Sequence, residues 1–95
     1  MIVTESKGVP RITITRRMRP EEYALQVIVD FNRGLERIGL IAYGRNVCIL
    51  ADTVAEVKRR LGDSVEIVAW DIDNRRTRNG RESYLYVELE YRPKF

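Results

Sequence analysis

The sequence of 95 residues contains no histidine, and this absence removes several kinds of site at once. Ser-His-Asp and Cys-His catalysis need an imidazole as general base, and histidine metal sites need it as a ligand. The single cysteine, Cys48, excludes an intrachain disulfide and a zinc cluster built on several thiolates. Glu88 and Glu90 are expected on one strand face, but no metal or base partner accompanies them. The sequence therefore predicts a protein that is not an enzyme and that holds no metal or cofactor.

Long apolar runs and a secretory leader are also missing. No apolar stretch approaches the ~18–20 residues that cross a membrane. Residues 1–5 carry neither a positive region nor an apolar region, so we expect a cytoplasmic protein without a signal peptide or a membrane partner. The charged fraction of 33% and the hydrophobic fraction of 44% are typical of a folded protein. We expect a flexible lead-in over residues 1–10 and a single domain over residues 11–95.

Lysine is scarce although the chain is basic. Of the 17 cationic residues, three are lysine and fourteen are arginine, and 14 acidic residues leave a net charge of +3. The planar guanidinium group makes bidentate contacts to phosphate and stacks on bases, which favours a nucleic-acid partner. Coding bias or a high-temperature host would give the same composition. The positions of the arginines therefore have to decide between these interpretations.

Hydrophobic periodicity predicts two helices and four strands. The expected strands cover residues 11–15, 36–43, 64–73 and 83–91, and the expected helices cover residues 20–33 and 47–61. This β-α-β-α-β-β order favours an α+β, two-layer α/β sandwich, in which both helices cover one face of a four-stranded mixed sheet. Because the first two strands flank a helix, we expect them to be parallel.

The last two strands are expected to continue into a long basic β-hairpin arm. Its four arginines fall within seven residues: Arg75, Arg76, Arg78 and Arg81. The dipeptide Asn79-Gly80 is a hairpin-turn signal. A protruding polar ribbon adds nothing to the core, so its charges indicate contact with a nucleic-acid groove or a phosphate row. The alternative is a solvated arm that keeps the sheet edge soluble.

Two further basic clusters lie at strand-to-helix junctions. Arg16, Arg17 and Arg19 precede the first helix, and Gly44-Arg45-Asn46 precedes the second, with Asn46 as a possible N-cap. Parallel strands would bring both junctions to one end of the sheet, where the helix amino termini add positive dipole ends. The combined surface predicts phosphate binding, whereas any one of these arginines alone would be interpreted as a solvated rim residue.

Alternation also predicts an aromatic row on the sheet face that the helices leave uncovered. Trp70, Tyr84, Tyr86 and Val68 are expected there, opposite the face of Leu85. Such residues need other cover, and a dimer interface is our preferred interpretation. A base-stacking surface and a partly exposed sheet are the alternatives.

In their order and spacing these motifs resemble the Alba family of archaeal chromatin and RNA-binding proteins. The resemblance covers residues 11–92 and rests on a series of short motifs together with the basic hairpin: Ile14-Thr15-Arg16-Arg17, Asn32-Arg33-Gly34, Gly44-Arg45-Asn46, Ala51-Asp52-Thr53-Val54 and Val65-Glu66-Ile67. It implies a fold like the carboxy-terminal domain of a translation initiation factor and a homodimer that binds double-stranded DNA, and often RNA, with little sequence preference. It also implies that the basic pair Arg16-Arg17 and the Gly44-Arg45 turn contact the backbone of the nucleic acid. The hairpin of each subunit would reach along the duplex.

The chain departs from the family pattern at a few positions. Arg16-Arg17 stands where the family commonly has two lysines, and arginine lacks the amine that lysine acetylation modifies. Met18-Arg19 lengthens the entry to the first helix. Leu61 stands where an aromatic residue helps dimers to pack side by side on DNA, and Tyr43 replaces a common basic residue.

We therefore predict a small homodimeric chromatin protein that compacts or coats DNA at the nucleoid. The residues expected to bind nucleic acid are Arg16, Arg17, Arg19, Arg45, Asn46, Arg75, Arg76, Arg78 and Arg81. An RNA-binding protein or a ribonucleoprotein subunit is the alternative function, and a heterodimer with a paralogue is an alternative assembly. No set of residues supports a nuclease. A protein-interaction module would need an acidic partner for the arginine-rich arm. No small-molecule substrate is expected.

Overall fold

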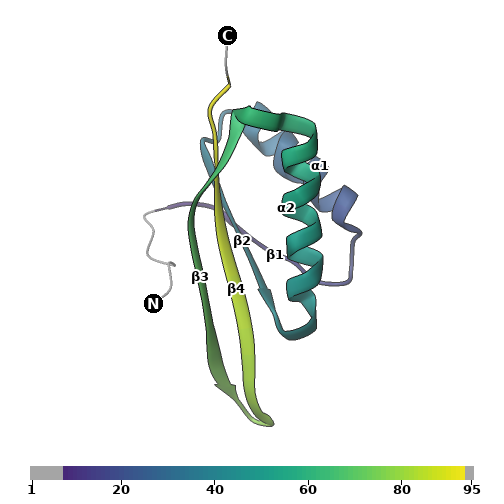
Figure 1. Ribbon diagram of the computed structural model, residues 1–95, viewed down its shortest axis with the longest axis vertical. Coiled ribbons are helices and arrows are strands. Elements are labelled where there is room, and N and C mark those ends of the chain that lie inside the picture. The colour runs from purple at the N-terminus through teal and green to yellow at the C-terminus, as the bar shows by residue number, and fades with distance from the viewer. Residues whose placement is uncertain (1–7, 94–95) are drawn as a thin grey trace.

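Two helices cover one face of a four-stranded mixed sheet, as the periodicity predicts (Figure 1). The computed structural model describes residues 8–93, so most of the predicted lead-in over residues 1–10 lies outside the described residues. The elements follow in the order β1 (Arg11–Thr13), α1 (Pro20–Asn32), β2 (Arg37–Tyr43), η2 (Gly44–Asn46), α2 (Val47–Leu61), η3 (Gly62–Ser64), β3 (Val65–Thr77) and β4 (Gly80–Tyr91). Within the sheet the strand order is β1-β2-β4-β3.

Local signals set the bounds of α1. Pro20 occupies the first turn, where a missing N–H costs no hydrogen bond. The Glu22 carboxylate accepts a hydrogen bond from the backbone N–H of Arg19 at 2.9 Å and lies near the positive end of the helix dipole. The helix ends before Gly34, whose φ of 109° is open to glycine and strained for other residues. Val27 and Phe31 are buried, so α1 packs toward the sheet through the face that carries them.

Helix α2 packs through Leu50, Thr53 and Val57, which are buried, whereas Ala51 is exposed. Asn46 occupies the N-cap position as predicted, but its side chain makes no capping hydrogen bond. The backbone of Asn46 is already helical, because the short helix η2 leads directly into α2. The Asn46 amide is therefore not used to begin the helix.

The sheet is parallel between β1 and β2 and antiparallel elsewhere. On the helix side, Leu40, Val87 and Leu89 belong to the main core. On the opposite face, Ile41, Tyr84 and Tyr86 form a second buried cluster. The prediction that Tyr84 and Tyr86 lie away from the helices is confirmed, but both rings are buried within the chain, at 8% and 0% exposure. Neither ring is available for base stacking.

Ion pairs and the Tyr86 ring cover the sheet face opposite the helices, against which no described helix packs. Tyr86 donates its hydroxyl to Glu88 at 2.8 Å, and Arg37 pairs with Glu88 at 3.2 Å and with Glu90 at 3.3 Å. The Tyr86 ring lies over Gly39, where an added Cβ would meet the ring carbon Cε1 at 2.7 Å. This pairing explains how the Glu88 carboxylate is tolerated at 4% exposure, since buried charges need partners.

The placement of Trp70 on the face opposite the helices was wrong, and a β-bulge is the reason. The register between β3 and β4 shifts between Ile67 and Ala69, so that Val68 is an extra residue. Beyond it Trp70 pairs directly with Val87, and directly paired residues point to the same face. One inserted residue reverses the faces of every later position, which carries Trp70 to the helix side.

The arm is a continuous two-stranded ribbon, as predicted. Strand pairing runs to Thr77 opposite Gly80, so the turn consists of residues 78–79 rather than Asn79-Gly80. The ribbon projects past the turn between β2 and α2 in Figure 1 and lies along the 49 Å long dimension of the molecule.

Candidate nucleic-acid interface

The two strand-to-helix junctions meet in one hollow of about 460 Å³. Arg16 contributes from the junction between β1 and α1, and Gly44, Arg45 and Asn46 contribute from the junction between β2 and α2. Parallel pairing of β1 with β2 places both junctions at the same end of the sheet. Within residues 8–93 the side chains of Arg16 and Arg45 form no ion pair, so both charges face solvent in the hollow.

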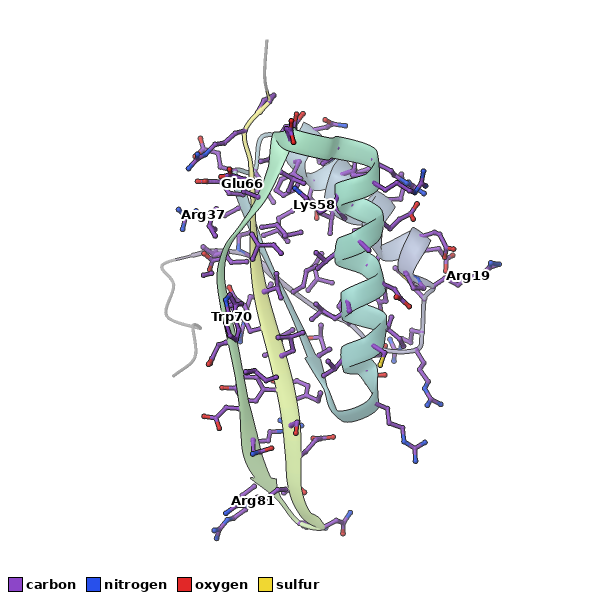
Figure 2. All side chains as sticks on the ribbon, viewed as in Figure 1. Arg19, Arg37, Lys58, Glu66, Trp70 and Arg81 are labelled. Carbon is purple, nitrogen blue, oxygen red and sulfur yellow. The ribbon has the colours of Figure 1, made fainter. Side chains whose placement is uncertain are left out.

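Hydrogen bonds around Tyr23 shape the junction after β1. Its hydroxyl accepts the backbone N–H of Thr15 at 3.0 Å, and the Thr15 hydroxyl accepts the backbone N–H of Arg17 at 3.2 Å. This turn separates the basic residues that are adjacent in sequence. Arg16 lines the hollow described above, whereas Arg17 lines a different hollow beside Tyr23 and Met18. Figure 2 shows Arg19 projecting from the side of the body near the start of α1.

At the second junction a glycine makes the tight turn possible. Gly44 has a φ of 57°, in the left-handed region that favours glycine, and the backbone N–H of Val47 donates to its carbonyl. Arg45 is exposed immediately after this turn. Because the Asn46 side chain does not cap α2, its amide remains available on the wall of the hollow.

Contacts between β2 and the hairpin anchor the base of the arm. The Arg75 guanidinium stacks on Tyr43, 3.8 Å from the ring centroid, and pairs with Glu82 across the hairpin. Tyr43 and Tyr84 are 6.1 Å apart between ring centroids, and the Tyr84 hydroxyl donates to Asp71 at 2.9 Å. Burial, reinforced by the hydrogen bond and charge of Asp71, raises the pKa of Tyr84. The arm is therefore held in a defined direction relative to the hollow.

The two faces of the arm differ in charge. Arg75 pairs with Glu82 on the face of Tyr84, and Asp73 lies directly opposite Tyr84 on that same face. On the other face, which continues the helix side of the sheet, Arg76 and Arg81 lie directly opposite each other. Their positive charges are exposed, and Arg78 is exposed in the turn. The structure thus gathers the arginines of the arm on one face and at the tip, except for Arg75.

An exposed apolar patch lies on β3 between the arm and the far end of the sheet. Ile67, Trp70 and Ile72 are 50%, 66% and 57% exposed, and all three point to the helix side. Strand β3 is an edge strand with β4 as its one neighbour in the sheet. Figure 2 shows Trp70 about midway between Arg81 near the tip of the arm and Glu66 at the other end of β3.

Sequence reasoning missed Glu82 and Ile72 as candidate functional residues. Glu82 lines the hollow beside Arg45, and Ile72 extends the apolar patch. The predicted turn at Asn79-Gly80 would have placed Glu82 opposite Thr77, so the pairing of Glu82 with Arg75 follows only from the turn at residues 78–79 that the structure shows. The position of Ile72 depends on the bulge at Val68, for which the sequence carries no signal.

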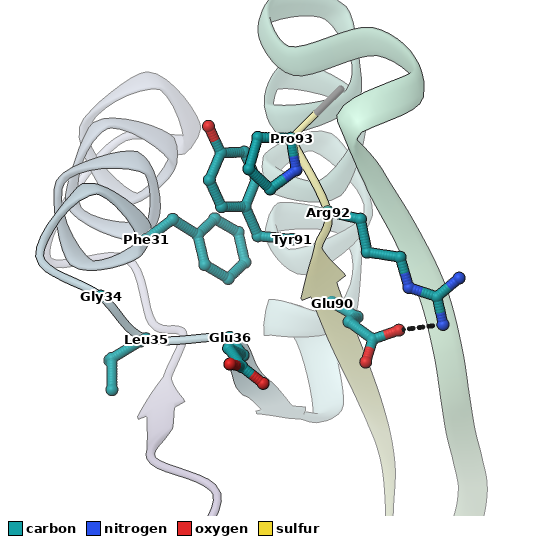
Figure 3. Close-up of a pocket in the computed structure, with 8 residues that line it drawn as sticks. All are labelled: Phe31, Gly34, Leu35, Glu36, Glu90, Tyr91, Arg92 and Pro93. Atoms are coloured by element: carbon teal, nitrogen blue, oxygen red, sulfur yellow. Dashed lines mark ion pairs between the residues drawn. The ribbon is translucent and has the colours of Figure 1, made fainter. Parts of the chain in front are cut away.

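A second hollow of about 470 Å³ lies at the opposite end of the sheet (Figure 3). Phe31 and Tyr91 stack in its wall with their ring centroids 5.0 Å apart. The arginine that lines it, Arg92, is already paired with Glu90 at 2.6 Å, and Glu36 adds a further negative charge. This balance of charge does not suit a phosphate group.

No group of three or more cysteine, aspartate or glutamate residues within residues 8–93 could hold a metal ion. Neither described helix combines the length and the apolar character that crossing a membrane requires.

Comparison with known proteins identifies two curated relatives, and no protein-family model matches the chain. The proteins named "DNA/RNA-binding protein Alba 2" from Saccharolobus shibatae and Saccharolobus solfataricus are 29% and 30% identical to the chain over 79 residues. These matches cover 83% of the chain and 89% of each relative. Among solved structures, Alba from Thermoplasma volcanium has the same fold, with a TM-score of 0.70 at 17% identity over 84% of this chain and 98% of that one.

Proposed function

The chain belongs to the Alba family, and on this basis we propose that it binds double-stranded DNA as a homodimer with little sequence preference. The observation that carries the proposal is the hollow in which Arg16 and Arg45, 29 positions apart in sequence, converge without an ion-pair partner among residues 8–93. Two guanidinium groups on an exposed surface that form no ion pair within the described residues favour an anionic ligand. The names of the curated relatives support a nucleic acid as that ligand.

Phosphate contacts would supply most of the affinity. Arginine donates to phosphate oxygens through a planar fork, and such contacts carry no sequence information by themselves. In the proposal Arg16, Arg45 and Asn46 hold one phosphate group, while Arg17 and Arg19 extend the contact along the backbone. Each neutralised phosphate is expected to contribute roughly −0.9 to the slope of log affinity against log salt concentration.

The arm would extend this contact beyond the body of the domain. Arg76 and Arg81 present their charges on one face of the ribbon, and Arg78 lies at its tip. A narrow two-stranded ribbon can follow a groove of the duplex while its arginines contact the phosphates that border the groove. Asp73 faces away from this contact, on the other face of the arm.

The homodimer would form through the apolar patch on β3. Ile67, Trp70 and Ile72 are exposed on the same face of β3, and contiguous exposed apolar patches mark interaction sites. The aromatic ring of Trp70 is typical of the residues that dominate interface energies. We expect Trp70→Glu to convert the dimer into a monomer in sedimentation velocity without loss of circular dichroism. A variant that sediments as the wild type does would exclude this patch as the interface.

RNA binding is the second candidate function, and the exposure of Trp70 favours it. Tyr84 and Tyr86 are buried, so Trp70 is the aromatic residue of the predicted row that would stack on an unpaired base, provided that the dimer forms elsewhere and leaves it exposed. Competition between duplex DNA and single-stranded RNA at one salt concentration separates the two functions. On either reading the proposed role is binding rather than catalysis, in the cytoplasm at the nucleoid.

The deciding experiment titrates a labelled ~20–30 base-pair duplex with the protein at several salt concentrations and follows fluorescence anisotropy. Two unrelated sequences should give the same steep negative slope. Arg16→Ala should flatten that slope by about 0.9 per subunit, and Arg33→Ala, which makes the same change in charge at the end of α1, should leave it unchanged. An Arg16→Ala slope equal to that of the wild type would refute the assignment of the hollow.

A further inference from the structure

Glu82 is the acidic residue in the wall of the proposed phosphate site. Its carboxylate lines the hollow together with Arg16 and Arg45, and its side chain is 36% exposed. One oxygen, Oε1, accepts hydrogen bonds from Arg75 Nε at 3.1 Å and from Arg75 Nη2 at 2.9 Å. The other oxygen, Oε2, lies 3.1 Å from the position that a Cβ on Gly44 would occupy.

The two oxygens of the Glu82 carboxylate have different surroundings. Oε1 is held by Arg75, whereas Oε2 lies against the Gly44 turn and accepts no hydrogen bond from Arg16 or Arg45. A phosphate in the hollow would therefore meet a fixed negative charge near its two cationic partners. Like charges at such short range repel, so the carboxylate and the phosphate compete for the same space and the same positive field.

Arg75 contacts two of the residues that line the hollow, Tyr43 and Glu82. The Tyr43 ring supports its guanidinium group at 3.8 Å, and the side chain is still 49% exposed. A guanidinium group has five N–H donors, and Glu82 engages Nε and Nη2. The Tyr43 ring contacts the guanidinium group over its ring face, whereas Glu82 accepts from its N–H groups, so a phosphate could replace the carboxylate while the ring contact is kept.

We propose that Glu82 is a tethered competitor for the nucleic-acid phosphate, a role that rests on the phosphate binding proposed above for this hollow. In the free protein Glu82 occupies the edge of the site and holds Arg75. When nucleic acid binds, a backbone phosphate displaces the carboxylate and takes over Arg75 as a third cationic partner. Glu82 thus lowers the affinity for every sequence alike and speeds release from the duplex.

The test replaces Glu82 with glutamine, which keeps the size of the side chain and an oxygen that accepts from Arg75. The matched control is Asp73→Asn, which removes the same charge from the same face of the arm but does not line the hollow. Glu82→Gln should tighten duplex binding by about eightfold per subunit at ~0.1 M salt, the value of one phosphate contact. Asp73→Asn should tighten it by less than about twofold. Equal gains for the two variants would show a general field effect and overturn the proposal.

Inorganic phosphate supplies a readout that does not depend on nucleic acid. Titration into ¹⁵N-labelled protein should shift the amide signals of Gly44 and Arg45 in Glu82→Gln at lower phosphate concentration than in the wild type or in Asp73→Asn. If the wild type binds no duplex while this difference persists, the proposed function fails and the competition at the hollow stands. If duplex binding is steeply salt-dependent but Glu82→Gln changes neither readout, the competitor role fails alone.

The transfer of Arg75 is tested separately. Arg75→Gln should weaken duplex binding by about eightfold per subunit, because a phosphate contact is lost. If Arg75 instead remained bound to Glu82 in the complex, the variant would bind as the wild type does or more weakly by less than about twofold, and the exchange of partners would be wrong.

Discussion

Replacing Arg81 with glutamate is expected to stabilise the arm and to weaken duplex binding in the same protein. Arg76 and Arg81 are direct partners across the hairpin and share one face. Two like charges about 6 Å apart in water repel by roughly 0.7 kcal/mol, and opposite charges attract by the same amount. The full change is therefore about 1.4 kcal/mol before screening, and about 0.5–1 kcal/mol after screening at ~0.15 M salt.

The same substitution removes one proposed phosphate contact from each arm. One contact contributes about 0.9 log units per tenfold change in salt, which is about eightfold at ~0.1 M relative to ~1 M. The two arms of a homodimer double the exponent, so the expected loss is roughly 60-fold before the repulsion of the new carboxylate is added. Stability and binding should thus move in opposite directions.

Amide hydrogen exchange of residues 74–83 measures the stability of the arm, and fluorescence anisotropy with a short duplex measures binding. Arg33→Glu is the control, since it makes the same change in charge at the C-cap of α1, at the end of that helix away from the arm. Slower exchange with unchanged affinity would refute the nucleic-acid role of the arm. Weaker binding with no slowing of exchange would show that the two side chains do not face each other.

Three further predictions concern single side chains. Gly39→Ala should lower the free energy of unfolding by about 1–3 kcal/mol in urea, because its Cβ would collide with the Tyr86 ring, and a change below about 0.5 kcal/mol would show that the ring moves freely. Burial and Asp71 raise the pKa of Tyr84, so from about pH 10 upward the unfolded chain loses this proton first and stability falls as the pH rises toward the raised value. Between about pH 9 and about pH 11 the urea midpoint should therefore fall further for the wild type than for Tyr84→Phe. An equal fall for the two proteins would contradict the assignment. Asn46→Ala should leave the melting temperature unchanged, unlike the ~1 kcal/mol cost of removing a functional N-cap, while it weakens duplex binding; a lower melting temperature would restore the capping role.

Periodicity in the sequence was sufficient to predict the architecture, because apolar residues recur with the period of a helix or of a strand in each segment. The expected helix over residues 20–33 and the expected strand over residues 36–43 correspond to α1 and β2 of the structure. The convergence of Arg16 with Arg45 was also predictable, since parallel strands bring successive junctions to one end of a sheet. What the residues at these junctions bind stays a prediction from geometry and family.

The features that sequence reasoning missed depend on register, which periodicity does not determine. Val68 lies within the apolar stretch of residues 67–70, and nothing in its neighbourhood marks it as an extra residue. Its presence moves Trp70 from the face of Tyr84 to the face of Val87. Likewise the contact between Arg75 and Glu82 follows from the exact length of the turn, and a shift of one residue would separate them.

The strand order has a consequence for when the protein can fold during its synthesis on the ribosome. The last strand to be synthesised, β4, lies in the interior of the sheet between β2 and β3, so no nascent chain shorter than about residue 91 contains a complete sheet. Contacts between segments far apart in sequence slow folding, and here the decisive ones belong to the final strand. The domain should therefore acquire its fold only after β4 has left the exit tunnel. A chain that ends before Gly80 should give the circular dichroism of an unfolded protein, and a cooperative melting transition in that fragment would contradict this order of events.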